Sequence, residues 1–289
     1  MRLDRLFASA LCLSQIAHCQ IGADLGTTIA KYPELSQFGK VLNDNPSLTS
    51  VFPANTTHGI TLLVPNNDAF EKLYNETGVS IEGIGNKRLV SILKYHIMMA
   101  NLTSQNFTDS RGLTVPTLLR EEQYNNRTAG PALVDKYGKD PAQGQVVYIS
   151  KDPINPAKLR VRQNTSNVSL RGGLGSVASI EPVNAQWSLG YIQITDTSAL
   201  YPVLDHTPNV TCLAPSTGAF QDAGSPDQNL NQTELKNALL FHTLHEVAYT
   251  DYLVDGTRLE SAAGLDVLVT IKGNDIYFND AKVISPNVL

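Results

Sequence analysis

A ten-residue stretch that occurs twice constrains the fold of this chain more than any other feature. Thr61–Phe70 reads TLLVPNNDAF, and Thr211–Phe220 reads TCLAPSTGAF, displaced by 211 − 61 = 150 residues. Each copy predicts a short apolar strand, which ends at the proline because proline cannot donate to a strand ladder. The polar residues that follow, beginning with Asn66 and Ser216, are typical of helix caps. Repetition at a fixed offset predicts two related units.

The order of elements around the two copies predicts an α+β fold. Apolar residues spaced three and four apart indicate helices over 24–51, 67–74 and 86–99. Alternating and β-branched runs indicate strands between 112 and 194. After the second copy, a helix over 237–244 and four strands between 256 and 284 follow in the same order. Helices followed by strands are typical of an α+β arrangement.

The chain divides into a leader and two units of unequal length. Residues 1–19 carry early arginines, an apolar middle and small residues before Gln20, which predicts a cleaved secretory signal. We expect the first unit over 20–203 and the second over 204–289. The second unit lacks counterparts of the first helices and of a final strand, a pattern that a shortened coding sequence would also give. We expect exposed apolar surface or an open sheet edge there, with low stability or self-association.

Composition predicts a protein of the export route. A net charge of −5 with 17% charged residues excludes nucleic acid as a typical partner. No run of 18 apolar residues follows the leader, so no transmembrane segment is expected. Beyond the leader only Cys212 remains, and its place in the repeated strand predicts a buried apolar side chain rather than a disulfide or a nucleophile.

Acceptor triplets for N-glycosylation occur more often than chance predicts and indicate a glycosylated surface. The asparagines of these triplets are Asn55, Asn75, Asn101, Asn106, Asn126, Asn164, Asn167, Asn209 and Asn231.

Taken in order, the motifs resemble those of the fasciclin domain family of secreted and surface adhesion proteins. The repeated stretch resembles the first motif of that family. The positions that resemble its central Tyr-His pair and its second motif are Tyr95-His96, Phe241-His242, Leu189–Asp196 with Gln193 in place of histidine, and Leu200-Tyr201-Pro202. The resemblance implies a wedge-shaped β-sheet with a group of helices, and binding rather than catalysis. It implies a secreted, cell-surface or cell-wall protein whose partner is an extracellular protein or a polysaccharide.

The segments near the second motif depart from the family pattern. Where the family often has Glu-Pro-Asp-Ile, this chain has Glu181–Asn184 and Ser285–Val288, so the acidic residue is missing in both copies. No Arg-Gly-Asp triplet occurs. These residues therefore give no support to a metal-mediated contact with an integrin.

Two interpretations of the Tyr-His pair remain open. In one, Tyr95 and His96, with Phe241 and His242 in the second copy, are exposed and bind a partner. In the other, they lie under the sheet with their polar atoms bonded to the backbone. The apolar spacing around Tyr95 favours the second interpretation.

The sequence offers little support for catalysis. His242 and His245 are three residues apart, so on one helix face they could hold a metal ion for a hydrolase. The order His242-x-x-His245-Glu246 does not match a zincin pattern. In the first copy, Met99 stands at the position that corresponds to His245. We predict no catalytic residue, no cofactor and no metal site. The alternative to adhesion is a vacuolar or lysosomal ligand-binding protein, which uses the same export route.

Overall fold

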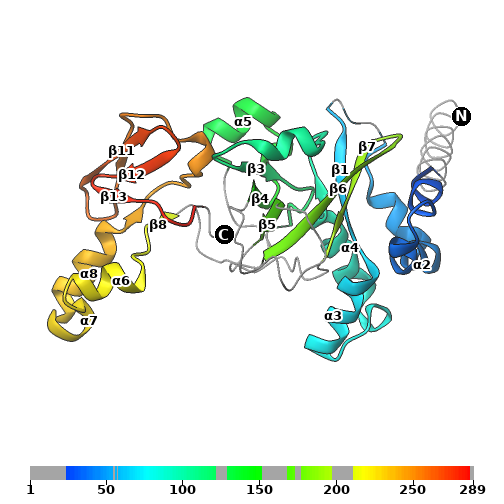
Figure 1. The fold of residues 1–289 in the computed structure, drawn as a ribbon, viewed down its shortest axis with the longest axis horizontal. Helices are drawn as coiled ribbons and strands as arrows, with labels where there is room; N and C mark the ends of the chain where they lie inside the picture. The colour runs from blue at the N-terminus through cyan, green and yellow to red at the C-terminus, as the bar shows by residue number, and fades with distance from the viewer. Residues whose placement is uncertain are drawn as a thin grey trace, which may run out of the picture.

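The computed structural model describes residues 24–54, 56, 58–121, 129–151, 168–172, 177–196 and 211–286. The predicted signal, the predicted strand over 159–161 and the Leu-x-Pro positions 200–202 lie outside these residues. The described chain forms two parts that each contain helices and a sheet, which confirms the α+β prediction (Figure 1).

The first part is built on a seven-stranded sheet with the order β2-β1-β7-β6-β5-β4-β3. Its strands are β1 (Ile60–Pro65), β2 (Ile97–Met98), β3 (Leu113–Pro116), β4 (Val146–Lys151), β5 (Val168–Arg171), β6 (Val177–Trp187) and β7 (Gly190–Thr195). Strand β1 pairs in parallel with β7, and every other pair is antiparallel.

The two edges of this sheet meet, which makes it barrel-like. Met98 pairs with Thr117 just beyond β3. On either side of this pair, the Met99 amide donates to the Pro116 carbonyl and the Leu118 amide to the Ile97 carbonyl, both at 2.8 Å. The first and last strands are therefore bonded to each other, and this part of the sheet has no open edge.

Strand β1 is buried on both faces. Leu62 and Val64 pack into the cluster under the helices, whereas Leu63 packs into the cluster inside the barrel. Gly190 permits the parallel neighbour to lie close, because a Cβ atom there would meet the Ile60 carbonyl oxygen at 2.0 Å. Its φ of +148° is also one that side-chain-bearing residues rarely adopt.

Helices cover one side of this barrel. Residues 24–29 are helical. They are followed by η1 (Pro33–Leu35), α2 (Ser36–Asp44), η2 (Pro46–Val51), α3 (Asn67–Thr77), η3 (Ile81–Gly83) and α4 (Asn86–Tyr95). Figure 1 shows α2, α3 and α4 on the side of the barrel away from the second part. Near the second part lie η4 (Ser104–Thr108), α5 (Pro131–Tyr137) and η5 (Pro141–Gln143).

The second part has two small sheets and short helices. Its elements are β8 (Thr211–Cys212), α6 (Thr217–Asp222), α7 (Pro226–Asn229), α8 (Gln232–Phe241), β9 (Thr243–Leu244), η7 (Thr250–Tyr252), β10 (Arg258–Glu260), β11 (Asp266–Lys272), β12 (Asp275–Phe278) and β13 (Ala281–Lys282). The strand orders are β8-β9 and β10-β11-β12-β13. Neither α6 nor α8 has a buried residue, whereas α4 buries four. Leu239 of α8 is 60% exposed. The low stability or self-association expected of this part remains a prediction.

Hydrogen bonds and an apolar cluster join the two parts beside α5. The Asp251 carboxylate accepts from the Thr114 amide at 2.8 Å and from the Thr114 hydroxyl at 2.6 Å. The hydroxyls of Tyr137 and Tyr252 both donate to the Thr114 carbonyl, at 2.9 and 3.2 Å. Tyr249 packs with residues of α5, η5 and β4. Further bonds outside η7 join the parts where Arg111 and Arg171 donate to the Leu253 and Pro286 carbonyls.

Candidate functional site

Both copies of the repeated stretch form the predicted cap. The Asn66 side chain accepts from the Ala69 amide at 2.9 Å, and the Ser216 hydroxyl accepts from the Ala219 amide at 3.1 Å. This bond satisfies one of the amides that the first turn of a helix leaves without a partner.

The threonine that opens each copy makes the same two hydrogen bonds. The Thr61 hydroxyl donates to the Ala100 carbonyl at 2.7 Å and accepts from the Leu102 amide at 2.8 Å. The Thr211 hydroxyl donates to the Glu246 carbonyl and accepts from the Ala248 amide, both at 2.8 Å. A hydroxyl that both donates and accepts satisfies two backbone groups of the segment after the Tyr-His helix.

Tyr95 and His96 are buried at the end of α4, which ends earlier than the predicted helix because residues 97–98 pair with β1. The Tyr95 hydroxyl donates to the Val146 carbonyl at 3.2 Å. The Leu63 amide donates to the His96 carbonyl at 2.9 Å, which ties the helix end to the repeated strand. This burial supports the packing interpretation of the pair, and binding through it remains an untested prediction.

The His96 imidazole is held in one tautomer. Its Nδ1 lies 2.9 Å from the Ile92 carbonyl oxygen, which can only accept, so we assign the proton to Nδ1. The other nitrogen, Nε2, is therefore an acceptor, and it is buried without a hydrogen-bond partner among the described residues. Burial lowers the pKa of His96 to about 4, and the Ile92 hydrogen bond offsets only part of this effect.

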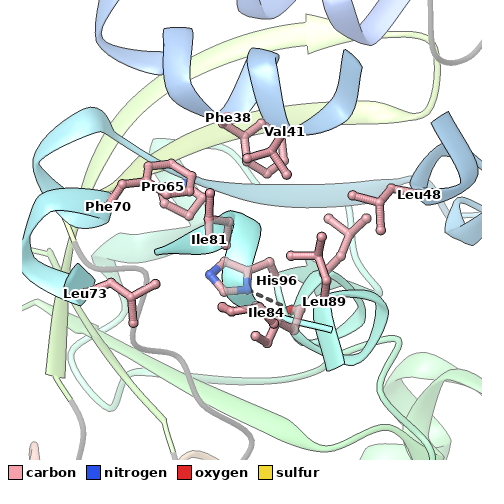
Figure 2. A pocket seen from close by; sticks show the side chains of 12 residues that line it. Phe38, Val41, Leu48, Pro65, Phe70, Leu73, Ile81, Ile84, Leu89 and His96 are labelled. Atoms are coloured by element: carbon pink, nitrogen blue, oxygen red, sulfur yellow. Dashed lines mark hydrogen bonds between the residues drawn. The ribbon is translucent and has the colours of Figure 1, made fainter. Parts of the chain in front are cut away.

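An apolar pocket lies against this nitrogen. Its walls come from four elements and the repeated stretch, as shown by Phe38, Pro65, Phe70, Leu73, Ile81 and Leu89 (Figure 2). In Figure 2 the ring nitrogen that makes no bond points toward the space between Phe70, Ile81 and Leu73. The empty space between the atoms is about 510 Å³ including the open mouth, of which about 40 Å³ admits the centre of a water molecule.

A polar groove adjoins this pocket. The empty space of the groove is about 700 Å³, of which about 350 Å³ admits the centre of a water molecule, and the groove shares Phe70 and Ile81 with the pocket. Its other walls are mostly polar or charged and include Glu71, Asn75 and Glu82. The apolar pocket therefore lies next to a more polar surface.

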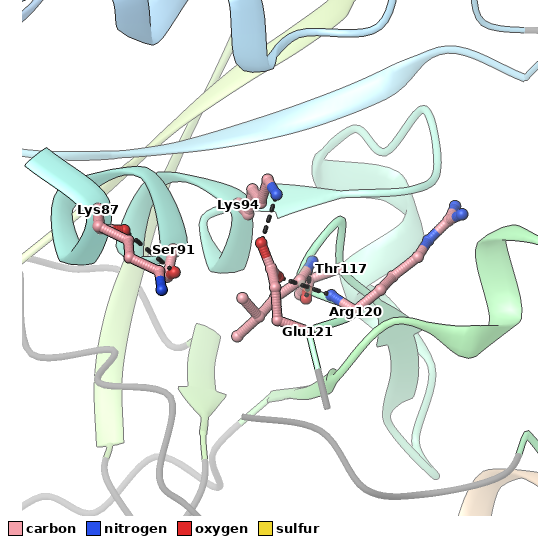
Figure 3. A network of polar contacts seen from close by, with 7 residues as sticks. Lys87, Ser91, Lys94, Thr117, Arg120 and Glu121 are labelled. Atoms are coloured by element: carbon pink, nitrogen blue, oxygen red, sulfur yellow. Dashed lines mark hydrogen bonds and ion pairs between the residues drawn. The ribbon is translucent and has the colours of Figure 1, made fainter. Parts of the chain in front are cut away.

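An ion pair fixes the α4 end from the other side. Lys94 on α4 pairs with Glu121, which follows the closing segment of the barrel (Figure 3). Burial alone would raise the pKa of Glu121, but the hydrogen bond from Lys94, its positive charge and the backbone amides of Arg120 and Glu121 together outweigh burial and lower the pKa. The pair is partly screened by water, so it positions α4 more than it stabilises the fold.

Gln193 and Asn184 are two positions at which this chain differs from the family pattern, and their side chains lie in one hydrogen-bond network. Gln193 is fully buried, and its Nε2 donates to the Leu102 carbonyl and to Asn184 Oδ1, both at 3.0 Å. Asn184 lies in a bulge of β6 with φ of +49°, and its backbone amide donates to Gln193 Oε1 at 3.1 Å. Asparagine tolerates this backbone conformation better than most residues. Gln193 and Asn184 therefore act together to tie β7 and the bulge of β6 to Leu102 and Ser104 in the segment after β2.

In the second copy, the described contacts of His242 differ from those of His96. His242 Nδ1 lies 2.7 Å from the Leu213 carbonyl oxygen, and the Phe241 and His242 rings meet edge to face at 6.3 Å. Helix α8 ends at Phe241, so the assumption that His242 and His245 share a helix face is wrong. No cluster of three potential metal ligands occurs within the described ranges.

Cys212 is exposed, and the prediction of burial is wrong. Its counterpart Leu62 is covered because β7 pairs with β1 on the side away from β2. Strand β8 pairs only with β9 in the described part of the chain. Equivalent sequence positions therefore have different surroundings.

The described acceptor asparagines for glycosylation are exposed: Asn75, Asn101, Asn106 and Asn231. Asn106 and Asn231 each use Oδ1 in a capping box, whereas a glycan attaches through Nδ2, so the cap and a glycan are compatible. Asn55, Asn126, Asn164, Asn167 and Asn209 lie outside the described residues.

Comparison with known proteins assigns the family. The fasciclin domain model matches residues 33–161 and 190–289, which is more than half of the chain. The chain belongs to the fasciclin domain family, with two tandem copies. It is similar to a solved FAS1 domain pair from the insect cell adhesion molecule fasciclin I, with 16% identity and a TM-score of 0.37, covering 90% of this chain and 93% of that chain. No curated protein matches the chain.

Proposed function

We propose that this chain is a secreted, N-glycosylated, non-enzymatic protein that mediates cell adhesion or contacts with an extracellular matrix or cell wall. Membership of the fasciclin domain family carries the proposal, because fasciclin domains are found in cell adhesion proteins. The expected partner is an extracellular or cell-surface protein, or a polysaccharide.

The predicted signal and the exposed acceptor asparagines support export. Within the described residues, no helix has the length and apolar character needed to cross a bilayer. Expression of the full chain in a secretory cell, followed by peptide-N-glycosidase treatment of the medium, tests this part. We expect a protein in the medium whose mass falls on treatment, and retention of an unmodified chain inside the cell would contradict the proposal.

Adhesion is tested with the purified, glycosylated chain coupled to beads. We expect the beads to aggregate or to bind cells, and beads coated with heat-unfolded chain to remain dispersed. Beads that behave alike with folded and unfolded chain would refute adhesion through the folded units. Microscopy of a tagged chain separates the extracellular location from the vacuolar or lysosomal lumen.

The second unit supports a further proposal, which is association with a second copy of the chain. The open side of β8 and the exposed Leu239 on α8 are the observations behind it. Light scattering over a concentration series should show a dimer that a Leu239→Glu variant weakens. A strictly monomeric chain at all concentrations would exclude self-association.

A further inference from the structure

The pocket against His96 combines apolar walls with one polar atom. Twelve residues line it, and His96 is the only one with a polar or titratable side chain. Small-molecule sites typically have this composition, with a few polar groups that orient the ligand among apolar side chains.

This polar atom, Nε2 of His96, lacks the hydrogen bond that a buried polar atom normally makes. Nε2 of His96 is buried, carries no proton in the assigned tautomer, and has no hydrogen-bond partner among the described residues. The large majority of buried side-chain polar atoms in folded proteins are hydrogen-bonded. The pocket in front of Nε2 therefore has room for a missing donor, and the chemistry of that donor defines the ligand.

We propose that the pocket binds a linear alcohol, whose alkyl chain packs among the apolar side chains and whose hydroxyl donates to Nε2 of His96. A hydroxyl is the simplest group that donates one hydrogen bond without carrying a charge into an apolar site. The space of about 510 Å³ includes the open mouth, so an alkyl chain can extend outward from a hydroxyl placed at Nε2. Phe70 and Ile81 also line the adjoining groove, so the outer end of a longer chain would lie near that groove.

The charge state of the site argues against a carboxylate. His96 remains neutral in neutral solution because burial lowers its pKa to about 4. Neither the pocket nor the backbone groups named above supply a cation to it. An ionised fatty acid would bury an unpaired charge beside a lone pair, which costs far more than burying a hydroxyl. This inference concerns ligand binding and does not depend on the proposed adhesion.

The test is a titration of the full chain, labelled with ¹⁵N at histidine, with 1-octanol. We expect the His96 Nε2 resonance to move and to saturate, because it gains a hydrogen-bond donor. Octane should not move it in this way, and octanoate at neutral pH should bind at least tenfold more weakly than 1-octanol. A resonance that stays in place with 1-octanol would mean that water alone occupies the site, and it would overturn the proposal.

Variants separate the hydrogen bond from the cavity. His96→Phe keeps a flat ring but removes the acceptor, and we expect 1-octanol binding to weaken about fivefold, the worth of one net hydrogen bond. The matched control is His242→Phe, at the equivalent position of the second copy, which should bind as the unaltered chain does. Val41→Phe fills the pocket from α2 and should abolish the Nε2 response even if His96→Phe fails to fold. Unchanged binding in either pocket variant would refute the assignment.

Discussion

Acidification should destabilise the first unit through His96. Its pKa is about 4 in the folded chain and 6.5 in the reference state, a difference of 6.5 − 4 = 2.5. A histidine whose folded pKa is lowered binds more protons when unfolded, so its contribution is complete above about pH 6.5 and is lost as the pH falls toward 4. Each pH unit in that window corresponds to about 1.4 kcal/mol, so the free energy of unfolding should fall by about 3 kcal/mol between pH 7 and pH 4.

The measurement is urea unfolding at pH 7, 5.5 and 4, followed by tryptophan fluorescence. Trp187 is the single tryptophan of the chain and packs against Phe52 in the helix-covered core, so it reports on the first unit. Other groups also titrate in this window, and the comparison with His96→Phe isolates the imidazole. The His96→Phe variant should lose about 3 kcal/mol less than the unaltered chain, whereas His242→Phe should lose as much. An equal loss in His96→Phe and the unaltered chain would refute the argument.

Three further predictions each change one side chain, and two of them have a matched exposed control. Leu93→Ala should lower the free energy of unfolding by about 2–5 kcal/mol, whereas Leu239→Ala at the equivalent helix position should change it by less than about 0.5 kcal/mol, as urea unfolding can show. Thr61→Val should cost about 2–4 kcal/mol by calorimetry, because the partly buried Ala100 carbonyl and the buried Leu102 amide lose the hydroxyl that bonds both, and a cost below 1 kcal/mol would contradict this. Asp251→Ala removes the two bonds to Thr114 and should speed proteolysis of the second unit at least tenfold, whereas exposed Asp280→Ala should leave the rate unchanged.

The sequence predicted best those features that depend on neighbouring residues. The strand, proline and cap of the repeated stretch were predictable because Asn66 and Ser216 need only the helix that follows them. The end of α4 was not predicted, because Ile97 and Met98 continue the apolar spacing of the helix although they lie in a buried strand. Periodicity alone cannot separate a short buried strand from a further helical turn.

The candidate site depends on contacts between distant segments and was therefore not predictable from spacing. Phe38, Ile81 and Leu89 come together at the pocket from three separate helices. The i−4 spacing of Ile92 and His96 was the one available signal, because a side chain at a helix end can bond the carbonyl one turn earlier. Cys212 shows how a contact with a distant segment can also mislead a prediction. Its burial was inferred from Leu62 in the first copy, but Leu62 is covered by β7, and β8 has no such neighbour among the described strands.

The motifs shared by the two copies make the same backbone contacts in both units, and the pocket lies in the first unit. In both units the amide of the strand leucine donates to the histidine carbonyl, from Leu63 to His96 at 2.9 Å and from Leu213 to His242 at 2.7 Å. This backbone bond holds the helix end on the repeated strand and does not require an exposed imidazole. The outer walls of the pocket come from α2 and η2, which precede the repeated stretch within the first unit. Because the described second copy has no equivalent of these elements, a ligand held at His96 has no second site at His242, and binding to the pocket should have a stoichiometry of one per chain.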